Sequence, residues 1–210
     1  MRIIEPSWCF EEEINPKVIM EKIERAGRTC YKSEGRIGDG TAEKFIAGII
    51  KRGHEAVLEN SSISVRIICD RGVSHEIVRH RLAAYCQEST RYCNYADGKF
   101  NRELTFIKPC YWEEGSEMYD VWENSMKALE QTYQFMVARK VKPEEARAIL
   151  PNSLKNELVM TANIREWRHF FKLRTSPAAH PQMREIAGMM LEGFKEKLPV
   201  LFGDIGGQDE

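Results

Sequence analysis

The sequence lacks most of the features that assign a chain to a class at once. Its six cysteines, at 9, 30, 69, 86, 93 and 110, form no C-x-x-C pair, which argues against a structural zinc site and a thioredoxin-like motif. No stretch approaches the roughly 18 to 20 apolar residues of a membrane-spanning helix. The start, MRIIEPSWCFEEE, has no apolar region of a secretory signal. We therefore expect a cytoplasmic protein with reduced thiols and no membrane partner.

The chain also lacks a surplus of either charge. It has 31 Lys and Arg against 32 Asp and Glu, a formal net charge of -1. Proteins that bind nucleic-acid polymers usually carry a clear basic excess, so we expect no such partner. Glycine-rich phosphate loops are missing as well, since neither G-x-G-x-x-G nor a P-loop lysine motif is present. A phosphate ligand would therefore depend on arginine side chains and on amides at helix ends.

The residues that are present can build a sizeable core. The chain has 210 residues, of which 42% are hydrophobic and 10% aromatic. Without an internal repeat or a linker, we expect a single domain over 1–210. Hydrophobic periodicity predicts an α+β fold, with a mixed or antiparallel sheet flanked by helices. The expected strands are 2–10, 62–69, 84–92, 104–107 and 157–162. The expected helices start at 16, 71, 117 and 143, directly after Thr41 and Asn163, and after the break at 177–181.

Local signals place the ends of several helices. Asn15 before Pro16, Thr41, Asp70 and Asn163 are each expected to cap a helix. Glu166 lies three residues after Asn163, which is the spacing of a capping box. The helix from 71 is expected to run to 82, the long one from 117 to 140, and the one from 163 to 174. The helix that begins at 143 is expected to carry Arg147, and the tail from 203 is expected to fray.

The segment 79–92 is the most unusual part of the chain. It holds three arginines, a histidine, a serine and two tyrosines within fourteen residues. Arginine suits the bidentate capture of phosphates and carboxylates, so this crowding indicates an anionic ligand. We expect Glu76, Arg79 and His80 to share one helical face. From 84 onward the period is two, which would direct Tyr85, Gln87, Ser89 and Arg91 to one side of a strand.

Other interpretations of these residues stay open on composition alone. Solvation or ion pairing explains Arg79, Arg81 and Arg91 as well as anion binding does, and explains Arg165 and Arg174 better. Ser89 has no G-x-S-x-G elbow, so an anion-binding hydroxyl is favoured over a nucleophile. Cys86 and Cys93 are interpreted as small buried thiols. His75 and His80 are five residues apart, a poor fit to one helical face, and we expect no metal site.

The motif RHRLAAYCQES has the form R-H-R, seven residues, then Ser, and it resembles the motif of flavin-dependent thymidylate synthases. The blocks GHEAVLEN, ARAILP and TANIREWRHFFKLR resemble further blocks of that family, in the same order, from 53 to 174. The resemblance implies the fold of that family and a homotetramer whose active sites are shared between subunits. It also implies the conversion of dUMP to dTMP, with 5,10-methylenetetrahydrofolate as carbon donor and NADPH-reduced FAD as hydride source.

Matching positions imply roles for single residues. Arg174 would bind the uracil edge and favour ionisation at N3, which makes it the expected catalytic residue. His54 would lie near both the flavin and the folate. The implied dUMP set is Glu76, Arg79, Gln87, Ser89, Arg91, Arg147 and Arg174. The implied FAD set is His54, Arg79, His80, Arg81, Gln87, Asn163, Arg165 and His169.

Four positions depart from the pattern of the family. Ala56 stands where a hydroxyl side chain is common, and Asn60 replaces a histidine after Glu59. Gln87 occupies a place often held by Glu, and His169 one often held by Asn. Ala56 and His169 keep open a relative that binds flavin or nucleotide without turnover. An RNA-binding module that uses 79–102 is a further alternative, which the net charge disfavours.

Overall fold

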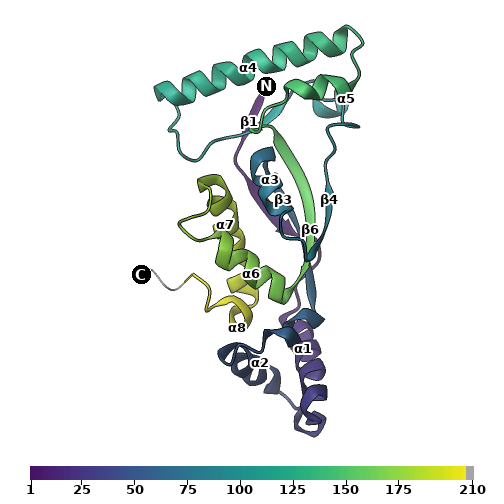
Figure 1. The fold of residues 1–210 in the computed structure, drawn as a ribbon, viewed down its shortest axis with the longest axis vertical. Coiled ribbons are helices and arrows are strands. Elements are labelled where there is room, and N and C mark those ends of the chain that lie inside the picture. Colours follow the sequence, from purple (N-terminus) through teal and green to yellow (C-terminus); the bar gives the residue numbers. More distant parts are fainter. Residues whose placement is uncertain (207–210) are drawn as a thin grey trace. The chain divides into compact units, whose positions relative to one another are not determined.

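The structure is a computed structural model that describes residues 1–206 (Figure 1). It confirms the α+β class, because the described chain contains helices together with two separate sheets. The chain divides into two units, each made of three segments. The first unit comprises Met1–Ser7, Ile67–Arg79 and Cys86–Val159, and the second comprises Trp8–Arg66, His80–Tyr85 and Met160–Glu210. The single domain predicted over 1–210 stays a prediction.

The strands form two sheets within the described residues. In the first, β1 (Arg2–Ile4) pairs in parallel with β5 (Thr105–Ile107). The second has the order β2-β3-β6-β4. The single strand predicted over 2–10 is wrong, because Pro6 has no N–H for a ladder and separates β1 from a strand of the other sheet. The strands of the second sheet are β2 (Ser7–Phe10), β3 (Ser62–Asp70), β6 (Lys155–Asn163) and β4 (Ala83–Gln87).

The first unit is built around α4 (Glu117–Ala138), the long helix that the sequence predicted. Ser116 caps it by accepting a hydrogen bond from the backbone N–H of Tyr119 at 3.3 Å. Met118 and Val121 continue the apolar periodicity of this helix, but both are exposed. The helix instead buries aromatic and sulfur-containing side chains against β5 and its surroundings, namely Tyr119, Trp122, Met126 and Tyr133. The remaining short elements of this unit are α3 (Arg71–Ile77), η3 (Gly98–Phe100), α5 (Pro143–Ala146) and η4 (Arg147–Ile149).

The second unit has an aromatic core on α6 (Ile164–Arg174). Trp167, Phe170 and Phe171 are fully buried, as predicted, and the indole N–H of Trp167 donates to the carbonyl of Ile63 at 3.0 Å. Helix α6 packs against α7 (Pro181–Lys197), which is followed by α8 (Pro199–Phe202). The other helices of this unit are α1 (Pro16–Tyr31), η1 (Glu34–Arg36), α2 (Thr41–Lys51) and η2 (Glu55–Asn60).

Helices α1 and α2 pack closely because α1 has a glycine at the contact. A Cβ atom on Gly27 would lie 2.6 Å from ring atoms of Phe45 and 2.9 Å from Val57. Asn15 caps α1 as predicted, since it accepts from the N–H of Val18 at 3.2 Å. The cap predicted at Thr41 is wrong, because Gly40 takes that place with a φ of 69°.

The tail does not fray as far as the sequence suggested. Ile205 is buried, and Asp204 forms an ion pair with Arg168. The rest of the predicted frayed tail, 207–210, lies outside the described residues. Among the helices of the described chain, none combines the length and the apolar character needed to cross a membrane.

Candidate active site

The R-H-R motif lies in the turn after α3, not on the helix. Asp70 caps α3 as predicted by accepting from the N–H of Val73 at 2.7 Å, but the helix ends at Ile77. The prediction that Glu76, Arg79 and His80 share one helical face is therefore wrong. Arg79 belongs to the first unit, and the second unit resumes at His80.

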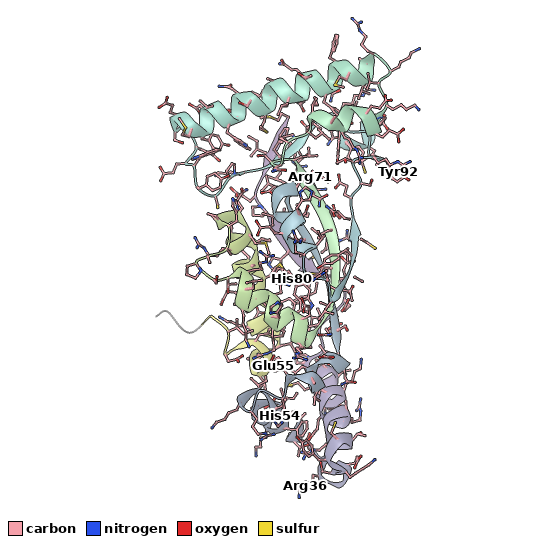
Figure 2. The ribbon with its side chains drawn as sticks, viewed as in Figure 1. Arg36, His54, Glu55, Arg71, His80 and Tyr92 are labelled. Atoms are coloured by element: carbon pink, nitrogen blue, oxygen red, sulfur yellow. The ribbon has the colours of Figure 1, made fainter. Side chains whose placement is uncertain are left out.

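His80 is the centre of a polar cluster in the second unit (Figure 2). Its side chain is buried, with the residue only 4% exposed, and its Nδ1 lies 3.0 Å from Oε1 of Glu166. Nε of Arg174 donates to Nε2 of His80 at 3.1 Å, and the hydroxyl of Tyr85 donates to the His80 carbonyl at 2.7 Å. A guanidinium can only donate, so Nε2 must accept and the imidazole proton belongs on Nδ1, directed at the carboxylate.

The electrostatics of this cluster favour a neutral imidazole. Burial lowers the pKa of His80, and the charge of Arg174 lowers it further, against the opposing effect of the Glu166 hydrogen bond. Burial also raises the pKa of the Tyr85 phenol to about 12, so this group stays protonated and can donate to His80. The imidazole thus acts as a fixed acceptor that orients Arg174, the predicted catalytic residue.

Glu166 was missed as a member of the site. The sequence predicted a capping role, and the N–H of Glu166 does donate to Oδ1 of Asn163 at 2.8 Å. Its carboxylate, however, contacts His80, which is 86 residues away in the chain. The only signal available in the sequence was an acidic residue in the first turn of a helix, and that signal is fully explained by capping.

His169 extends the cluster toward the surface. Its ring centroid lies 5.6 Å from that of His80, and the side chain is exposed. Ligand atoms of His80, Glu166 and His169 lie within 4.8 Å of one another, a spacing that a metal ion could use. Both ring nitrogens of His80 already have partners, and one partner is the cationic Arg174, whose charge opposes a second cation. We therefore interpret these residues as a hydrogen-bonded cluster.

The other residues of the implied FAD set that belong to the second unit lie on three of its segments. His54 precedes η2, and its Nδ1 is 3.4 Å from the hydroxyl of Tyr31 (Figure 2). Nη1 of Arg165 forms an exposed ion pair with Glu59 at 2.6 Å. Asn163 uses its side chain to cap α6. Arg81 is exposed and has no ion pair within the described part of the chain, so its charge is available to an anionic ligand.

The implied dUMP set lies mainly in the first unit. Strand β4 ends at Gln87, which is earlier than predicted, and Ser89 begins a turn in which its carbonyl accepts from the N–H groups of Tyr92 and Cys93. Nε2 of Gln87 donates to Oγ of Ser74 at 3.1 Å. The predicted strand alternation therefore holds only up to Gln87, and the side chains of Ser89 and Arg91 are presented by a turn.

Arg91 connects this turn to the segment that carries Arg147. Its Nε donates to Oε2 of Glu144 at 3.2 Å, in an exposed ion pair. Glu144 lies on α5, which ends at Ala146, so Arg147 begins η4 and is not on the helix that was predicted to carry it. The first unit thus brings the turn with Ser89 and Arg91 next to α5.

A second polar network holds the turn from its other side. Oε2 of Glu88 accepts from Nζ of Lys155 at 2.7 Å, and Oε1 accepts from the hydroxyl of Tyr95, also at 2.7 Å. Burial and the hydrogen bond with Glu88 raise the pKa of Tyr95 far above its usual range. The sequence did not indicate Lys155 or Tyr95, because both contacts join residues distant in the chain or on different segments. Their effect is to fix the backbone between Gln87 and Ser89.

The dUMP set and the FAD set lie mostly in different units of the chain. All residues of the dUMP set except Arg174 belong to the first unit. All residues of the FAD set except Arg79 and Gln87 belong to the second unit.

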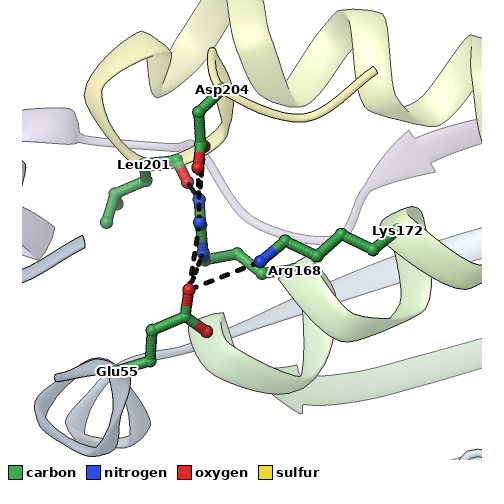
Figure 3. A network of polar contacts seen from close by, with 5 residues as sticks. All are labelled: Glu55, Arg168, Lys172, Leu201 and Asp204. Atoms are coloured by element: carbon green, nitrogen blue, oxygen red, sulfur yellow. Dashed lines mark hydrogen bonds and ion pairs between the residues drawn. The ribbon is translucent and has the colours of Figure 1, made fainter. Parts of the chain in front are cut away.

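Arg168 holds three segments of the second unit together (Figure 3). Although it is one of the charged residues of α6, it is only 1% exposed. Its guanidinium donates to both carboxylate oxygens of Asp204 at 2.7 Å, to Oε1 of Glu55 at 3.1 and 3.2 Å, and to the carbonyl of Leu201. Lys172 adds a longer contact of 3.5 Å to the same oxygen of Glu55.

The charges in this network stabilise one another. Burial by itself would lower the pKa of Arg168, but hydrogen bonds with Asp204 and Glu55 raise it. The hydrogen bond from Arg168 in turn lowers the pKa of Asp204. Because Glu55 directly follows His54, the network also fixes the backbone that presents His54. Neither Glu55 nor Asp204 could be assigned to Arg168 from sequence spacing.

The stability of the chain should depend on the protonation of His80. Above pH 6.5, its usual pKa, the folded and unfolded states both hold a neutral imidazole. Below this pH the unfolded chain takes up a proton that the folded chain resists until its lower pKa, so the free energy of unfolding falls with acid. In denaturant unfolding between about pH 5 and 7.5, His80→Asn should flatten this decline. His75→Asn, at an exposed position of α3, should show the same dependence of the unfolding free energy on pH as the original protein. Equal slopes in the original protein and both variants would show that His80 does not cause the decline.

Arg168→Met should lower the free energy of unfolding strongly. Removing one partner of a buried ion pair costs about 3 to 5 kcal/mol, and we expect the lower end because Asp204 is partly exposed. Arg165→Gln is the matched control on the same helix, since it breaks an exposed ion pair and should cost less than about 1 kcal/mol. Denaturant unfolding measures both, and similar losses in the two variants would show that the network does not stabilise the fold.

The sequence of this chain matches one family model and several known proteins. The family model described as "Thymidylate synthase complementing protein" matches residues 18–200. A flavin-dependent thymidylate synthase of Pyrococcus furiosus is 36% identical over 172 residues, which are 81% of this chain and 70% of that protein. One from Geobacter sulfurreducens is 34% identical over 188 residues, 86% of this chain and 79% of that protein.

A solved structure has the same fold. It is the crystal structure of a UMP/dUMP methylase from Streptomyces cacaoi bound with 5-Br dUMP, with a TM-score of 0.78. The match covers 97% of this chain and 96% of that one, at 19% identity, which supports the fold alone. The family model and the relatives agree with the R-H-R-x7-S motif and with the blocks around it. The chain belongs to the flavin-dependent thymidylate synthase family.

Proposed function

We propose that this chain converts dUMP to dTMP, with 5,10-methylenetetrahydrofolate as carbon donor and FAD, reduced by NADPH, as hydride source. The family supports a flavin enzyme that methylates a uracil nucleotide. The observation that carries the proposal is the placement of Arg174, whose Nε is held by Nε2 of the motif histidine His80 at 3.1 Å. Tetrahydrofolate would be the second product.

The second unit has the donors that an anionic flavin dinucleotide requires. Arg81 has an uncompensated charge in the described part of the chain, and His169 presents an exposed ring beside His80. Arg165 and His54 are exposed as well. We propose that these side chains, with Asn163, Arg79 and Gln87, hold FAD. When bound, FAD supplies the hydride that reduces the transferred carbon to a methyl group.

Arg174 acts on the uracil ring in this proposal. The neutral imidazole of His80 accepts one N–H of Arg174 without cancelling the positive charge of the guanidinium. A cation fixed at the uracil edge stabilises the negative charge that develops when N3 loses its proton, which activates the ring. Because Glu166 and Tyr85 fix His80, the guanidinium is preorganised before substrate arrives.

The turn after β4 provides the matching anion site for the nucleotide. The Ser89 hydroxyl accepts from the N–H of Arg91 at 3.3 Å, so its own O–H is available to donate to a phosphate oxygen. Within residues 1–206, Arg91 forms its ion pair with the exposed carboxylate of Glu144, an interaction that a phosphate can replace at low cost. We propose that Ser89, Arg91 and Arg147 bind the phosphate of dUMP, with Glu76, Arg79 and Gln87 around the nucleotide.

We further propose a homotetramer in the cytoplasm. The predicted ligand residues are divided between the two units, which is compatible with sites completed by other subunits. Large apolar side chains are exposed on α4, as expected of a surface that packs against a partner, namely Met118, Val121 and Phe135. The six cysteines are free thiols, which suits a reducing compartment.

The function is tested directly with the purified chain. It should show a flavin absorbance spectrum and form dTMP from dUMP when methylenetetrahydrofolate and NADPH are supplied. Tight dUMP binding to a flavin-loaded, reduced sample without any dTMP would instead identify a non-catalytic relative, the alternative that Ala56 and His169 keep open. Steeply salt-dependent RNA binding without competition by dUMP would favour the RNA-binding alternative.

Arg174→Ala should reduce dTMP formation on the order of 100-fold or more, because a preorganised charge at the reacting ring is lost. The flavin spectrum should stay unchanged, since Arg174 belongs to the dUMP set only. Arg184→Ala is the matched control, an exposed arginine of α7 that should leave both properties intact. An equal loss of flavin and activity in Arg174→Ala would show that this arginine supports cofactor binding instead.

A further inference from the structure

A basic groove lies between α1 and α2 in the second unit, apart from the residues discussed so far. Its volume is about 320 Å³. The floor contains an aromatic ring and a glycine, and the rim contains cationic side chains. The lining residues are Arg28, Thr41, Lys44, Phe45, Gly48 and Arg52.

The groove carries three cationic side chains, and the carboxylate of Glu24 pairs with only the first of them, Arg28. Nη2 of Arg28 pairs with the buried Oε1 of Glu24 at 2.8 Å, and its guanidinium lies 4.5 Å from the centroid of the Phe45 ring. Lys44 and Arg52 are exposed and have no ion pair within residues 1–206. Two cations therefore stand without counter-charge beside an apolar surface, an arrangement that suits an organic anion.

The two unpaired cations are separated along one helical face. Lys44, Gly48 and Arg52 follow one another at intervals of four, so they line up on α2. The guanidinium of Arg52 folds back along the helix, since its atoms lie 3.3 to 3.8 Å from a Cβ built on Gly48. Its charge therefore lies about one helical turn from the position of Lys44, roughly 5 to 6 Å. A single phosphate would be better served by cations that converge, whereas this row suits a chain with several charges and apolar links between them.

Gly48 leaves room for the guanidinium of Arg52. The three atoms nearest to a Cβ on Gly48 all belong to this flexible group, at 3.3 to 3.8 Å. This differs from Gly27, where a Cβ would collide with Phe45 and Val57. A glycine inside a helix costs about 1 kcal/mol relative to alanine. At Gly48 the close neighbour is the side chain of Arg52 and not α1, so the glycine allows this cation to lie along the groove.

The groove begins next to His54. Arg52 is followed by Gly53, whose φ of 70° turns the chain, and then by His54. From the other helix, Tyr31 contacts Nδ1 of His54 and lies three residues, or about one turn, beyond Arg28. A ligand at His54 could therefore extend along the row from Arg52 to Lys44.

We propose that this groove binds the oligo-γ-glutamate tail of the folate cosubstrate, with Arg52 and Lys44 meeting successive carboxylates of the tail. The proposal rests on the proposed function and on the expected position of the folate near His54, which the family resemblance implies. The methylene groups of the glutamyl links would lie over the ring of Phe45, while the carboxylates reach the cationic side chains. The groove would thereby favour polyglutamylated over monoglutamylated methylenetetrahydrofolate.

The test compares KM for the monoglutamate and triglutamate forms of methylenetetrahydrofolate. The original protein should show a KM about tenfold lower for the triglutamate, since each exposed ion pair contributes up to about 1 kcal/mol. The double variant Lys44→Gln, Arg52→Gln should lose most of this preference with kcat unchanged. Lys51→Gln is the matched control, an exposed lysine of α2 that does not line the groove. Equal KM values for the two forms in the original protein would overturn the proposal.

A binding experiment separates this inference from the proposed function. Calorimetry with p-aminobenzoyl-triglutamate requires no turnover and should give tighter binding than with p-aminobenzoyl-monoglutamate. Gly48→Leu should abolish the difference by filling the floor without neutralising a cation. If the chain forms no dTMP but retains this groove-dependent difference, the function fails and the groove assignment stands. Two results together would show that the groove is a general anion site and that the proposal is wrong. In the first, tripolyphosphate displaces p-aminobenzoyl-triglutamate to the same extent as free tri-γ-glutamate. In the second, Gly48→Leu does not change the affinity for p-aminobenzoyl-triglutamate.

Discussion

The contact between His80 and Glu166 decides how the chemistry of the second unit is arranged. It joins the segment after α3 to the first turn of α6, two parts of the chain 86 residues apart. Because the carboxylate accepts the Nδ1 proton, Nε2 is left as the acceptor that holds Arg174 at the far end of the same helix. A protonated imidazole could not accept from a guanidinium, so the low pKa of His80 and the position of Arg174 depend on each other.

Helix α6 shows how this arrangement is made rigid. Its apolar side chains, Trp167 and Phe171 among them, fill the core, which leaves its polar residues facing other segments at close range. A buried guanidinium is tolerated only when its donors are satisfied, and Arg168 satisfies them with Glu55, Asp204 and a carbonyl. The requirement to pair one buried charge therefore fixes the segment beside His54 and the chain after α8. The ion pairs of Arg168 thus stabilise the fold and also fix the segment that presents His54.

Local interactions are the part of this structure that the sequence predicts well. The caps at Asn15, Asp70 and Asn163 join atoms three residues apart, so their residue types and spacing were sufficient. The ends of α3 and β4 were predicted too late, because the continuation of a periodic pattern does not reveal where tertiary contacts take over. Glu166 was assigned a capping role and Arg168 only a polar position on its helix, since their partners lie 86 and 113 residues away. The motif itself identified the family, but only the fold gave each residue its partner.

Two glycines on neighbouring helices illustrate what spacing alone leaves undecided. Gly27 and Gly48 both interrupt an apolar helical pattern, and in the sequence both have the same helix-weakening effect. In the structure, Gly27 is required by the close packing of α1 and α2, whereas Gly48 faces a groove that a side chain would fill. The same two helices end near Tyr31 and His54, whose side chains are in contact. Close packing at Gly27 therefore fixes the distance between the helices that line the groove, and Gly48 lies within that groove. The two glycines act together, because the first holds the helices in place and the second keeps the basic groove free of a side chain at its own position.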